Sequence, residues 1–452
     1  MTQQARVKAK GKPIPSLRIV PVGSFLIRNL QSILEKYPDI VHLRLGITQF
    51  YLLTNPEYIQ EVLVTKQRDF VKGEYLQKTK KVFGEGLLTS EGDFHHRQRR
   101  LVQPAFHQKR IEAYAKTMTA YAERTMKRWH DGAVLDIHKE MNKLTMSIVA
   151  KCLFDTDVES ESESIARDLS TTIEYFDRLS SPLSALLSKL PSNKKYEAAV
   201  KRIDSMIYDL IEQRRRLGKD AGDLMSMLLH ARDESGGEMT DSQLRDEVLI
   251  LFAAGHETTA NALTWTWYLL SENPDVEARM LEEVDRAIPK GEAPSASDVS
   301  KLEYTTKVFT ESMRIYPPAW ILVRKALKEI SIGEYLLPAD ANVVMSQYVN
   351  HHDPKYFPEP EKFLPERWTQ EFKRSLPRFA YYPFGGGPRG CVGEPFAWME
   401  GVLLLATLSK RWRMRHVRGH KVEMQPRITL RPKFGMRMKL ERRDKPLTGL
   451  KN

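Results

Sequence analysis

One stretch near the C-terminal end, residues 383–393, constrains the chain more strongly than any other. It reads PFGGGPRGCVG, and its three glycines between two prolines predict a loop with backbone conformations that other residues avoid. Cys391 stands near the end of this loop, just before a predicted helix at residues 394–408 with Pro395 in its first turn. The N-terminus of that helix and the N–H groups of the loop would stabilise a thiolate.

A buried structural cysteine on a glycine-rich turn is the ordinary interpretation of a single cysteine. Five positions of the loop together favour a functional site instead: Phe384, Gly387, Arg389, Cys391 and Gly393. Zinc and iron–sulfur sites need several thiolates, and this sequence has only two cysteines. A cysteine nucleophile needs a positioned histidine, which no motif signals.

A haem iron, by contrast, needs one axial protein ligand, and a cysteine thiolate in that place favours O–O cleavage. The glycines of the loop would let a large flat ligand lie against the backbone. Arg389, two residues before Cys391, would reach an acidic substituent of that ligand. The other cysteine, Cys152, falls in an apolar helical run and is expected to be part of the core.

Composition sets the class of protein. The chain has 452 residues, for which two or three domains are the default, and its 41% hydrophobic and 28% charged residues are typical of a soluble globular protein. The polar, basic residues 1–12 lack the apolar segment of a signal peptide or membrane anchor. Together with the low cysteine content, this predicts a protein of a reducing compartment, the cytoplasm.

The net charge of +12 is concentrated near the C-terminus, where residues 410–445 hold 14 Lys and Arg against 3 Asp and Glu. These charges alternate with apolar residues, as on the solvent face of a strand. That interpretation is favoured over a surface for an anionic membrane or an acidic protein partner. No aromatic-basic module accompanies the charge, so a nucleic acid partner is not expected.

Hydrophobic periodicity predicts a mainly α-helical chain with a smaller β part. Strands are expected in residues 41–54, 320–349 and 412–441. A mobile loop is expected at residues 71–93, and an apolar lid at residues 179–191. The main helices are expected at residues 56–65, 94–103, 193–217, 244–270, 274–288, 302–316 and 394–408.

The helix at residues 244–270 is the longest apolar one, and Thr240 and Gln243 form a capping box before it. Its length would suit a membrane span, but the ionisable residues His256 and Glu257 in its middle argue against one. We therefore expect a central buried helix with a polar interruption.

That interruption predicts a notch. Ala254 and Thr258 lie one turn apart on the same face, and the threonine hydroxyl can bond back to the carbonyl four residues earlier. Gly255 lowers the resistance of the helix to bending. Dioxygen or water would then fit beside a hydroxyl and the carboxylate of Glu257. The alternative is a satisfied threonine and glutamate on a helix that borders solvent.

Two further patterns support a site around this helix. Glu311 and Arg314 lie three residues apart and, with Arg367 of a later Pro-Glu-Arg stretch, would form a buried Glu–Arg–Arg brace rather than a surface ion pair. His95 and Arg99 lie one turn apart on a basic helix and would donate hydrogen bonds to a carboxylate.

In this order the motifs resemble those of the cytochrome P-450 superfamily of haem-thiolate monooxygenases, over nearly the whole chain. They are His-x-x-x-Arg, Ala-Gly-x-Glu-Thr, Glu-x-x-Arg, Pro-Glu-Arg and Phe-x-x-Gly-x-Arg-x-Cys-x-Gly. Each is weak alone, whereas the ordered set is specific. The resemblance implies one helical, prism-shaped domain over residues 1–452 around a haem b, in place of the two or three domains expected from length.

The resemblance also implies roles for individual residues. Cys391 would be the axial iron ligand, Phe384 would pack near its sulfur, and Thr258 and Glu257 would deliver protons for oxygen activation. His95 stands where many relatives have tryptophan, and it still donates a hydrogen bond. The residues expected to hold the haem propionates are Arg389, Arg324, His95 and Arg99, and those expected to contact the haem are Gly387, Gly393 and Ala254.

The activity implied is insertion of one atom of O2 into a lipophilic substrate by hydroxylation or epoxidation, with fatty acids and terpenoids as candidates. The sequence ends soon after the β part, so electrons from NAD(P)H would come through a separate ferredoxin or flavodoxin, docked at Arg97 and Arg100. The alternatives are a peroxygenase or isomerase of the same fold, a haem sensor, or a helical interaction protein without haem. The substrate pocket would be shaped by residues 71–93, 179–191, 252–254, 319–322 and 426–429.

Overall fold

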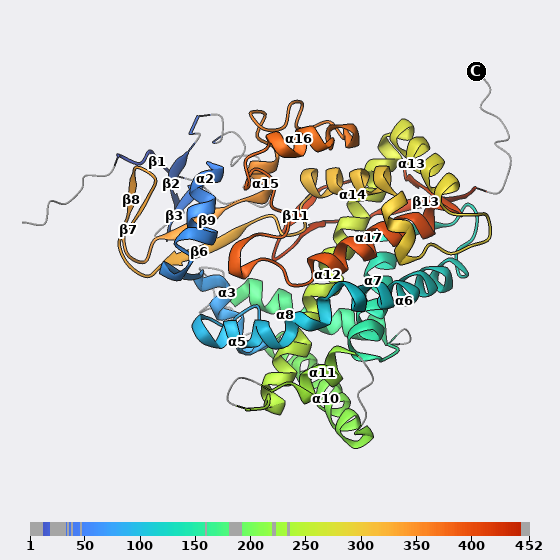
Figure 1. Cartoon of the computed structure of the whole chain (residues 1–452), viewed down its shortest axis with the longest axis horizontal. Coiled ribbons are helices and arrows are strands. Elements are labelled where there is room, and N and C mark those ends of the chain that lie inside the picture. The colour runs from blue at the N-terminus through green and yellow to red at the C-terminus, as the bar shows by residue number, and fades with distance from the viewer. Residues whose placement is uncertain are drawn as a thin grey trace, which may run out of the picture.

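Helix α12, Asp241–Glu272, runs through the centre of the molecule and organises the helical part (Figure 1). The structure is a computed structural model. The capping box of α12 is formed as expected, because Thr240 Oγ1 accepts from Gln243 N at 3.2 Å and Gln243 Oε1 accepts from Thr240 N at 2.9 Å. The residues that the structure describes are 12–18, 33, 36–37, 39–45, 48–158, 161–179, 192–218, 223–232 and 236–443.

Buried helices surround α12 and share one large hydrophobic core with it. Gly255 allows α7 to pack closely against α12, since a Cβ there would lie 3.1 Å from Val149 Cγ2 on α7. Helices α10 and α11 lie together at the lower end of Figure 1, and α8 lies above them. The helices are α5 Gly92–Val102, α6 Gln108–Met126, α7 Ile137–Phe154, α8 Ser162–Leu179, α10 Ser192–Leu217, α11 Leu224–His230, α13 Pro274–Ala287, α14 Glu303–Ile315, α15 Gln347–His351, α16 Gln370–Ser375 and α17 Glu394–Ser409.

A six-stranded sheet lies at one end of the molecule, with strand order β1-β2-β3-β9-β6-β4 (Figure 1). Strands β2 and β3 form the antiparallel hairpin expected near residues 41–54, and β3 continues the sheet through parallel pairing with β9. Residues 347–349 were expected to be strand but belong to α15, where Ser346 Oγ caps the helix by accepting from Val349 N at 3.3 Å. The strands are β1 Ser16–Arg18, β2 Ile40–Leu45, β3 Thr48–Leu53, β4 Phe70–Lys72, β6 Leu322–Ala326 and β9 Asn342–Met345.

The C-terminal strands explain the basic charge there. In β13, Arg437–Arg442, the buried Met438 and Leu440 alternate with the exposed Arg437 and Lys439, so the charges of this strand lie on a solvent face as expected. Strand β13 pairs with β10 and also with β5, a pairing that the sequence did not predict. The other strands are β5 Val134–Asp136, β7 Ile330–Ile332, β8 Tyr335–Leu337, β10 Trp412–His416, β11 Met424–Pro426 and β12 Leu430–Pro432.

The segment expected to be an irregular loop, residues 71–93, is largely structured. It contains most of β4 and two short helices, α3 Glu74–Lys78 and α4 Lys80–Phe83. Its backbone is tied to α12, because Glu85 N donates to Asp246 Oδ2 at 2.8 Å. Helices this short give little periodicity, which is why the sequence did not reveal them. Of the lid expected at 179–191, residues 180–191 lie outside the described residues.

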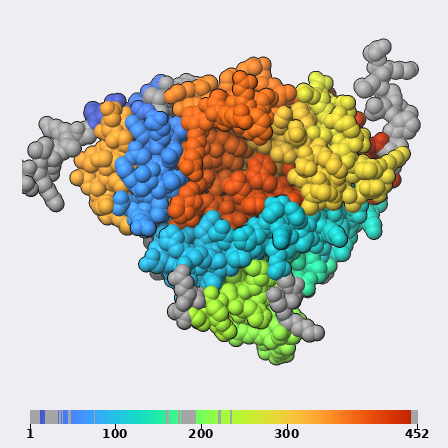
Figure 2. Space-filling view, viewed as in Figure 1, coloured from blue at the N-terminus to red at the C-terminus, as the bar shows by residue number. Residues whose placement is uncertain are grey.

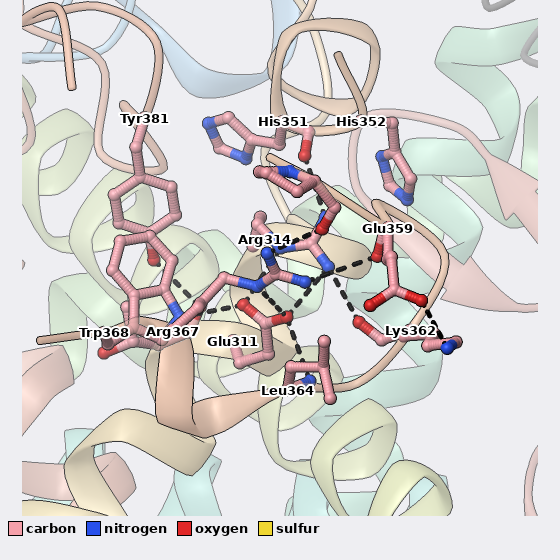
Figure 3. Close-up of polar contacts among 12 residues, drawn as sticks. Glu311, Arg314, His351, His352, Glu359, Lys362, Leu364, Arg367, Trp368 and Tyr381 are labelled. Carbon is pink, nitrogen blue, oxygen red and sulfur yellow. Dashed lines mark hydrogen bonds and ion pairs between the residues drawn. The ribbon is translucent and has the colours of Figure 1, made fainter. Parts of the chain in front are cut away.

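The Glu–Arg–Arg brace is confirmed (Figure 3). Glu311 and Arg314 are both fully buried, and Arg314 Nε and Nη2 each donate to the Glu311 carboxylate at 2.9 Å. Arg367 Nε donates to the same carboxylate at 2.9 Å. Two donors that the sequence did not reveal complete the set, namely Trp368 Nε1 at 2.8 Å and Leu364 N at 3.2 Å. The brace fastens α14 to the irregular segment that leads to the cysteine loop.

No helix in the described parts of the chain combines the length and the apolar character that crossing a bilayer requires.

Candidate functional site

The cysteine loop is held in shape by its own backbone. Cys391 N donates to Phe384 O at 3.0 Å, Gly385 N to Tyr382 O at 2.9 Å, and Gly390 N to Gly387 O at 3.0 Å. Two of the bonds close turns and the third joins the two ends of the loop, so the cysteine is presented on a rigid frame directly before α17. The Phe384 ring lies against Trp398 of α17, with ring centroids 5.7 Å apart.

The glycines of the loop are required mainly by the packing of the chain itself. Gly387 has a φ of +66°, and a Cβ there would lie 2.0 Å from Leu63 O. A Cβ on Gly386 would lie 2.4 Å from the Phe379 ring. Gly393 is less restricted, because its Cβ would meet Phe106 at 3.6 Å and Cys391 Sγ at 4.0 Å. The sequence suggested that these glycines leave space for a flat ligand. At Gly386 and Gly387, contacts within the chain itself require glycine.

The thiol of Cys391 is accessible to solvent. Surrounding protein atoms nevertheless raise the pKa of the Cys391 thiol to about 11, since burial outweighs the N–H groups of Gly393 and Glu394 and the charge of Arg99. The N–H groups at the helix N-terminus thus lower the pKa of the thiol as expected, but by less than burial raises it. The Cys391 sulfur is a neutral thiol until a metal ion displaces its proton.

Positive charge gathers beside this loop. Lys72, Arg324 and Arg389 line one small cavity of about 10 Å³ with Glu91. Burial, with repulsion among these neighbours, lowers the pKa of Lys72 well below its usual value and that of Arg324 to about 10. Arg389 forms an ion pair with Glu91, and its Nη1 donates to Ser90 O at 2.7 Å. Three cationic side chains around one paired carboxylate leave a surplus of positive charge that an anionic ligand would neutralise.

His95 presents an unused ring nitrogen near the same cations. Its Nδ1 lies 3.1 Å from Leu87 O, and since a carbonyl only accepts, Nδ1 carries the proton. Its Nε2 is buried without a hydrogen-bond partner. Burial and the nearby charges of Arg389 and Lys72 lower the pKa of His95 to about 3. An orphaned ring nitrogen beside surplus positive charge is the arrangement that a bound acid group would complete.

Arg99 and Arg324 differ in how they contribute. Arg99 Nη1 donates to Gly390 O at 2.7 Å, so it ties helix α5 to the cysteine loop. Arg324 is buried in β6, with Nη1 3.1 Å from Val323 O. Antiparallel pairing of β4 with β6 sets Lys72 opposite Arg324, which explains how two like charges come together.

The hydrogen bond that the sequence predicted for the notch in α12 is formed. Thr258 Oγ1 donates to Ala254 O at 2.8 Å, the bond to the carbonyl four residues earlier. Ala254 is exposed although it lies in the middle of a helix with long buried stretches, so its side chain is not covered by the packing of the described residues. The neighbouring Glu257 is hydrogen-bonded to another part of the chain, because its Oε1 accepts from Thr429 Oγ1 at 2.7 Å.

A cavity of about 570 Å³ lies on the opposite face of α12. It contains Val248, Leu249 and Phe252 of α12 together with residues of α7, α8 and α10, and does not include Cys391. At 100° per residue, these three positions point away from the face that carries Ala254 and Thr258. The cavity is therefore separated from the cysteine site by the helix itself.

A second hollow opens on the face seen in Figure 2, where the orange, yellow and red-orange parts of the chain meet. The cavity there measures about 400 Å³. Its lining combines aromatic rings with the exposed cations Lys373 and Arg378. Trp398 of the lining also contacts Phe384 of the cysteine loop, so the hollow lies directly behind that loop.

Sequence reasoning gave no individual role to three residues of the site, Lys72, Glu91 and Thr429, although the expected pocket segments 71–93 and 426–429 contain them. Each belongs to a segment without a motif and reaches the site through tertiary contacts alone. The alternation of β4 was the one available signal, since it places Lys72 on the buried face with Phe70. Among the described residues, no group of three His, Cys, Asp or Glu is placed to hold a metal ion, so a metal here would depend on one protein ligand.

These residues fit a haem. A single thiol on a rigid loop would be the axial ligand, the surplus cations and the orphaned His95 Nε2 suit its two carboxylates, and exposed Ala254 leaves room beside Thr258. The surplus cations and the orphaned His95 Nε2 are unfavourable without such a group, because they leave buried charge and a buried polar atom unmatched.

Comparisons with known proteins agree with this site. The family model described as "Cytochrome P450" matches residues 17–439. Cyclooctatin synthase of Streptomyces melanosporofaciens is 40% identical over 402 residues, covering 88% of this chain and 87% of its own length. Pentalenene oxygenase of Streptomyces avermitilis is 34% identical over 407 residues, covering 89% and 88%. The crystal structure of the cytochrome P450DA haem domain superposes with a TM-score of 0.86 at 24% identity, covering 96% of this chain and 98% of that chain, which supports the fold.

Proposed function

The chain belongs to the cytochrome P450 family of monooxygenases, and on this premise we propose that it hydroxylates or epoxidises a terpenoid-like substrate. The observation that carries the oxygen chemistry is the Thr258–Ala254 bond at 2.8 Å, which lies beside the exposed Ala254 and the carboxylate of Glu257. The substrate class is supported by the similarity to cyclooctatin synthase, to cyclooctat-9-en-7-ol 5-monooxygenase (37% identical over 391 residues) and to pentalenene oxygenase.

Haem b is the cofactor of this family, and NAD(P)H supplies its electrons through a partner. We assign Cys391 as the iron ligand, with Phe384 beside the sulfur, and Lys72, Arg99, Arg324 and Arg389 as the donors to the two carboxylates. His95 would join them by taking up a proton on Nε2, because its Nδ1 proton is already bonded to Leu87 O. When bound, the haem supplies the iron at which O2 is reduced and cleaved. Arg99 contributes in a second way, because its bond to Gly390 O fixes the loop that presents the sulfur.

Two residues of α12 would handle protons. The Thr258 hydroxyl already donates to Ala254 O, so it accepts a further hydrogen bond on its oxygen and positions water in the notch. The Glu257 carboxylate accepts from Thr429 at Oε1 and would take up and release a proton. Apolar parts of Ala254 and of residues 319–322 and 426–429 would hold the substrate and exclude water from the notch. Phe252, which was expected in the same pocket, instead lines the cavity on the opposite face of α12.

We place the electron donor, a ferredoxin or flavodoxin, over the hollow behind the cysteine loop. The proposal is supported by the exposed cations Lys373 and Arg378 in that hollow. Arg97 and Arg100 of α5 are the further candidates from the sequence. An acidic donor would be attracted there, and screening by salt would weaken the attraction. A cytoplasmic location fits such donors.

One spectrum tests the haem site. Reduced protein with carbon monoxide should show the absorption of a thiolate-ligated haem, and Cys391→Ala should lose it.

Titration with terpenoid hydrocarbons and alcohols should then shift the spin state of the iron at lower concentrations than fatty acids of equal carbon number do. Tighter binding of fatty acids would refute the substrate class. Turnover with peroxide as fast as with the reduced donor would identify a peroxygenase instead.

Charge reversal tests the donor surface. Lys373→Glu with Arg378→Glu should slow reduction by the donor about tenfold at low salt and flatten its salt dependence. Lys439→Glu, an exposed cation on β13, is the matched control and should leave the rate unchanged. Equal effects of the two changes would place the donor elsewhere.

A further inference from the structure

Glu257 ends a chain of hydrogen bonds that crosses three parts of the fold. Thr429 Oγ1, on the turn between β11 and β12, lies 2.7 Å from Glu257 Oε1. Asn261 Nδ2, one turn further along α12 than Glu257, lies 3.1 Å from the same hydroxyl. His138 Nε2 on α7 lies 3.0 Å from Asn261 Oδ1. Asn261 and Thr429 are both buried, so these contacts are formed away from bulk water.

The chemistry of an ionised carboxylate fixes the direction of every bond in this chain. A carboxylate only accepts hydrogen bonds, so the hydroxyl of Thr429 must donate its single proton to Glu257. The Thr429 oxygen then accepts from the amide nitrogen of Asn261, and the amide oxygen must accept from His138. Burial lowers the pKa of His138, and its remaining single proton must therefore lie on Nε2. Asp136 and Glu257 oppose that lowering, and Arg431 adds to it.

Protonation of Glu257 allows the opposite direction. The acid O–H then donates to Thr429, Thr429 donates to a rotated Asn261 amide, and the amide nitrogen donates to His138 Nε2, whose proton moves to Nδ1. Both directions satisfy Thr429, the Asn261 amide and His138 Nε2 with the same number of hydrogen bonds. A chain that runs equally well both ways removes the penalty that an unmatched buried donor would impose on either state.

The turn that carries Thr429 is fastened in place, so the chain has a fixed end. Trp265 Nε1 of α12 donates to Leu430 O at 3.0 Å, and Trp320 Nε1 donates to Arg427 O at 2.8 Å. Leu430 N also donates to Pro318 O at 2.9 Å. With the backbone fixed, only the direction of the hydrogen bonds is free to change.

We propose that Thr429, Asn261 and His138 are positioning residues for Glu257, joined in a hydrogen-bond chain whose direction reverses with the protonation of Glu257. The proposal rests on the role of Glu257 as the proton-handling acid. The chain holds Oε1 in one place in both states, because Thr429 donates to Oε1 when Glu257 is ionised and accepts from it when Oε1 carries the proton. The ring nitrogen of His138 that carries its hydrogen differs between the two states.

Nitrogen NMR of the haem-loaded protein tests the direction of the chain. The protein is labelled with 15N-histidine and measured in the reduced, carbon-monoxide-bound form, and His138→Gln identifies the resonances by their loss. With Glu257 ionised, His138 should carry its proton on Nε2 alone. Glu257→Ala removes the acceptor that fixes the direction, so the Nδ1–H form should appear beside it. An Nδ1–H form in the unmodified protein, or no change in Glu257→Ala, overturns the proposal whether or not the protein is a monooxygenase.

A pair of isosteric variants tests the positioning. Thr429→Val removes the donor to Glu257 and should lower product formed per NAD(P)H about tenfold, the effect of losing one hydrogen bond to a charged group. Thr429→Ser, which keeps the hydroxyl, should restore the yield. Thr264→Val is the matched control, since Thr264 is equally buried and bonds only to Ala260 O of its own helix. A yield in Thr429→Val equal to that of the control refutes the positioning role.

Discussion

Removing the carboxylate of Glu311 should destabilise the protein far more than removing any exposed ion pair. Glu311 is fully buried and accepts from Arg314 twice and from Arg367, Trp368 and Leu364 once each. In Glu311→Ala the guanidinium of Arg314, also fully buried, loses its partner charge. Breaking a buried pair in this way costs about 3–5 kcal/mol, which is a large part of a typical folding free energy of roughly 5–15 kcal/mol.

Urea unfolding followed by fluorescence measures this loss. Glu311→Ala should unfold at clearly lower urea than the unmodified protein, or fail to accumulate, whereas Glu311→Gln should retain part of the bonding and lie between them. Arg216→Ala, which breaks the exposed Arg216–Glu212 pair on α10, should change the free energy of unfolding by less than about 1 kcal/mol. The double variant Glu311→Leu with Arg314→Met should be less destabilised than the sum of the single changes. Equal losses in Glu311→Gln and Arg216→Ala would refute the reasoning.

Three further perturbations follow from the site. Burial raises the pKa of Glu247 to about 7 from 4.5, so the contribution of this residue to stability is complete below pH 4.5 and is lost as the pH rises through 7. The free energy of unfolding should therefore fall between pH 5 and 8, and Glu247→Gln should flatten that fall. An unchanged slope in Glu247→Gln would contradict this. Gly387→Ala should prevent haem incorporation, read from the carbon monoxide spectrum, because its Cβ would lie 2.0 Å from Leu63 O; Gly419→Ala, with a φ of +84° but nothing within 4 Å, is the control and should still bind haem. Arg324→Met should stabilise the haem-free protein in urea yet speed haem loss to a scavenger, since the guanidinium is buried among cations; slower haem loss would show that it does not contact the haem.

The sequence predicts best those features whose residues lie close together along the chain. The Thr258–Ala254 bond and the Glu311–Arg314 pair follow from helical spacing, and both are confirmed. Trp368 donates to the same carboxylate from far along the chain, and no spacing rule could reveal it. Strand β5 was missed for a similar reason, because its three residues are stabilised only by pairing with β13.

Charge states were the part of the site that local patterns predicted least well. The helix N-terminus beside Cys391 led us to expect a stabilised thiolate, yet burial outweighs the N–H groups and raises the pKa. Lys72 carries no motif, and its importance arises only when sheet pairing sets it opposite Arg324. Desolvation depends on every atom that surrounds a group, whereas a motif describes only its neighbours in sequence.

The ionisable groups of the haem site share one property that explains how the site selects its ligand. Burial acts against the charged form of Cys391, of Lys72 and of Arg324, whatever the sign of the charge. A neutral molecule would leave all three penalties in place, and a simple anion would relieve only the cations. A ligand that brings a metal cation to the sulfur and two carboxylates to the cations relieves all three at once. With these residues as its haem site, the folded protein would be least strained with the haem bound, and the free energy so released would add to haem affinity.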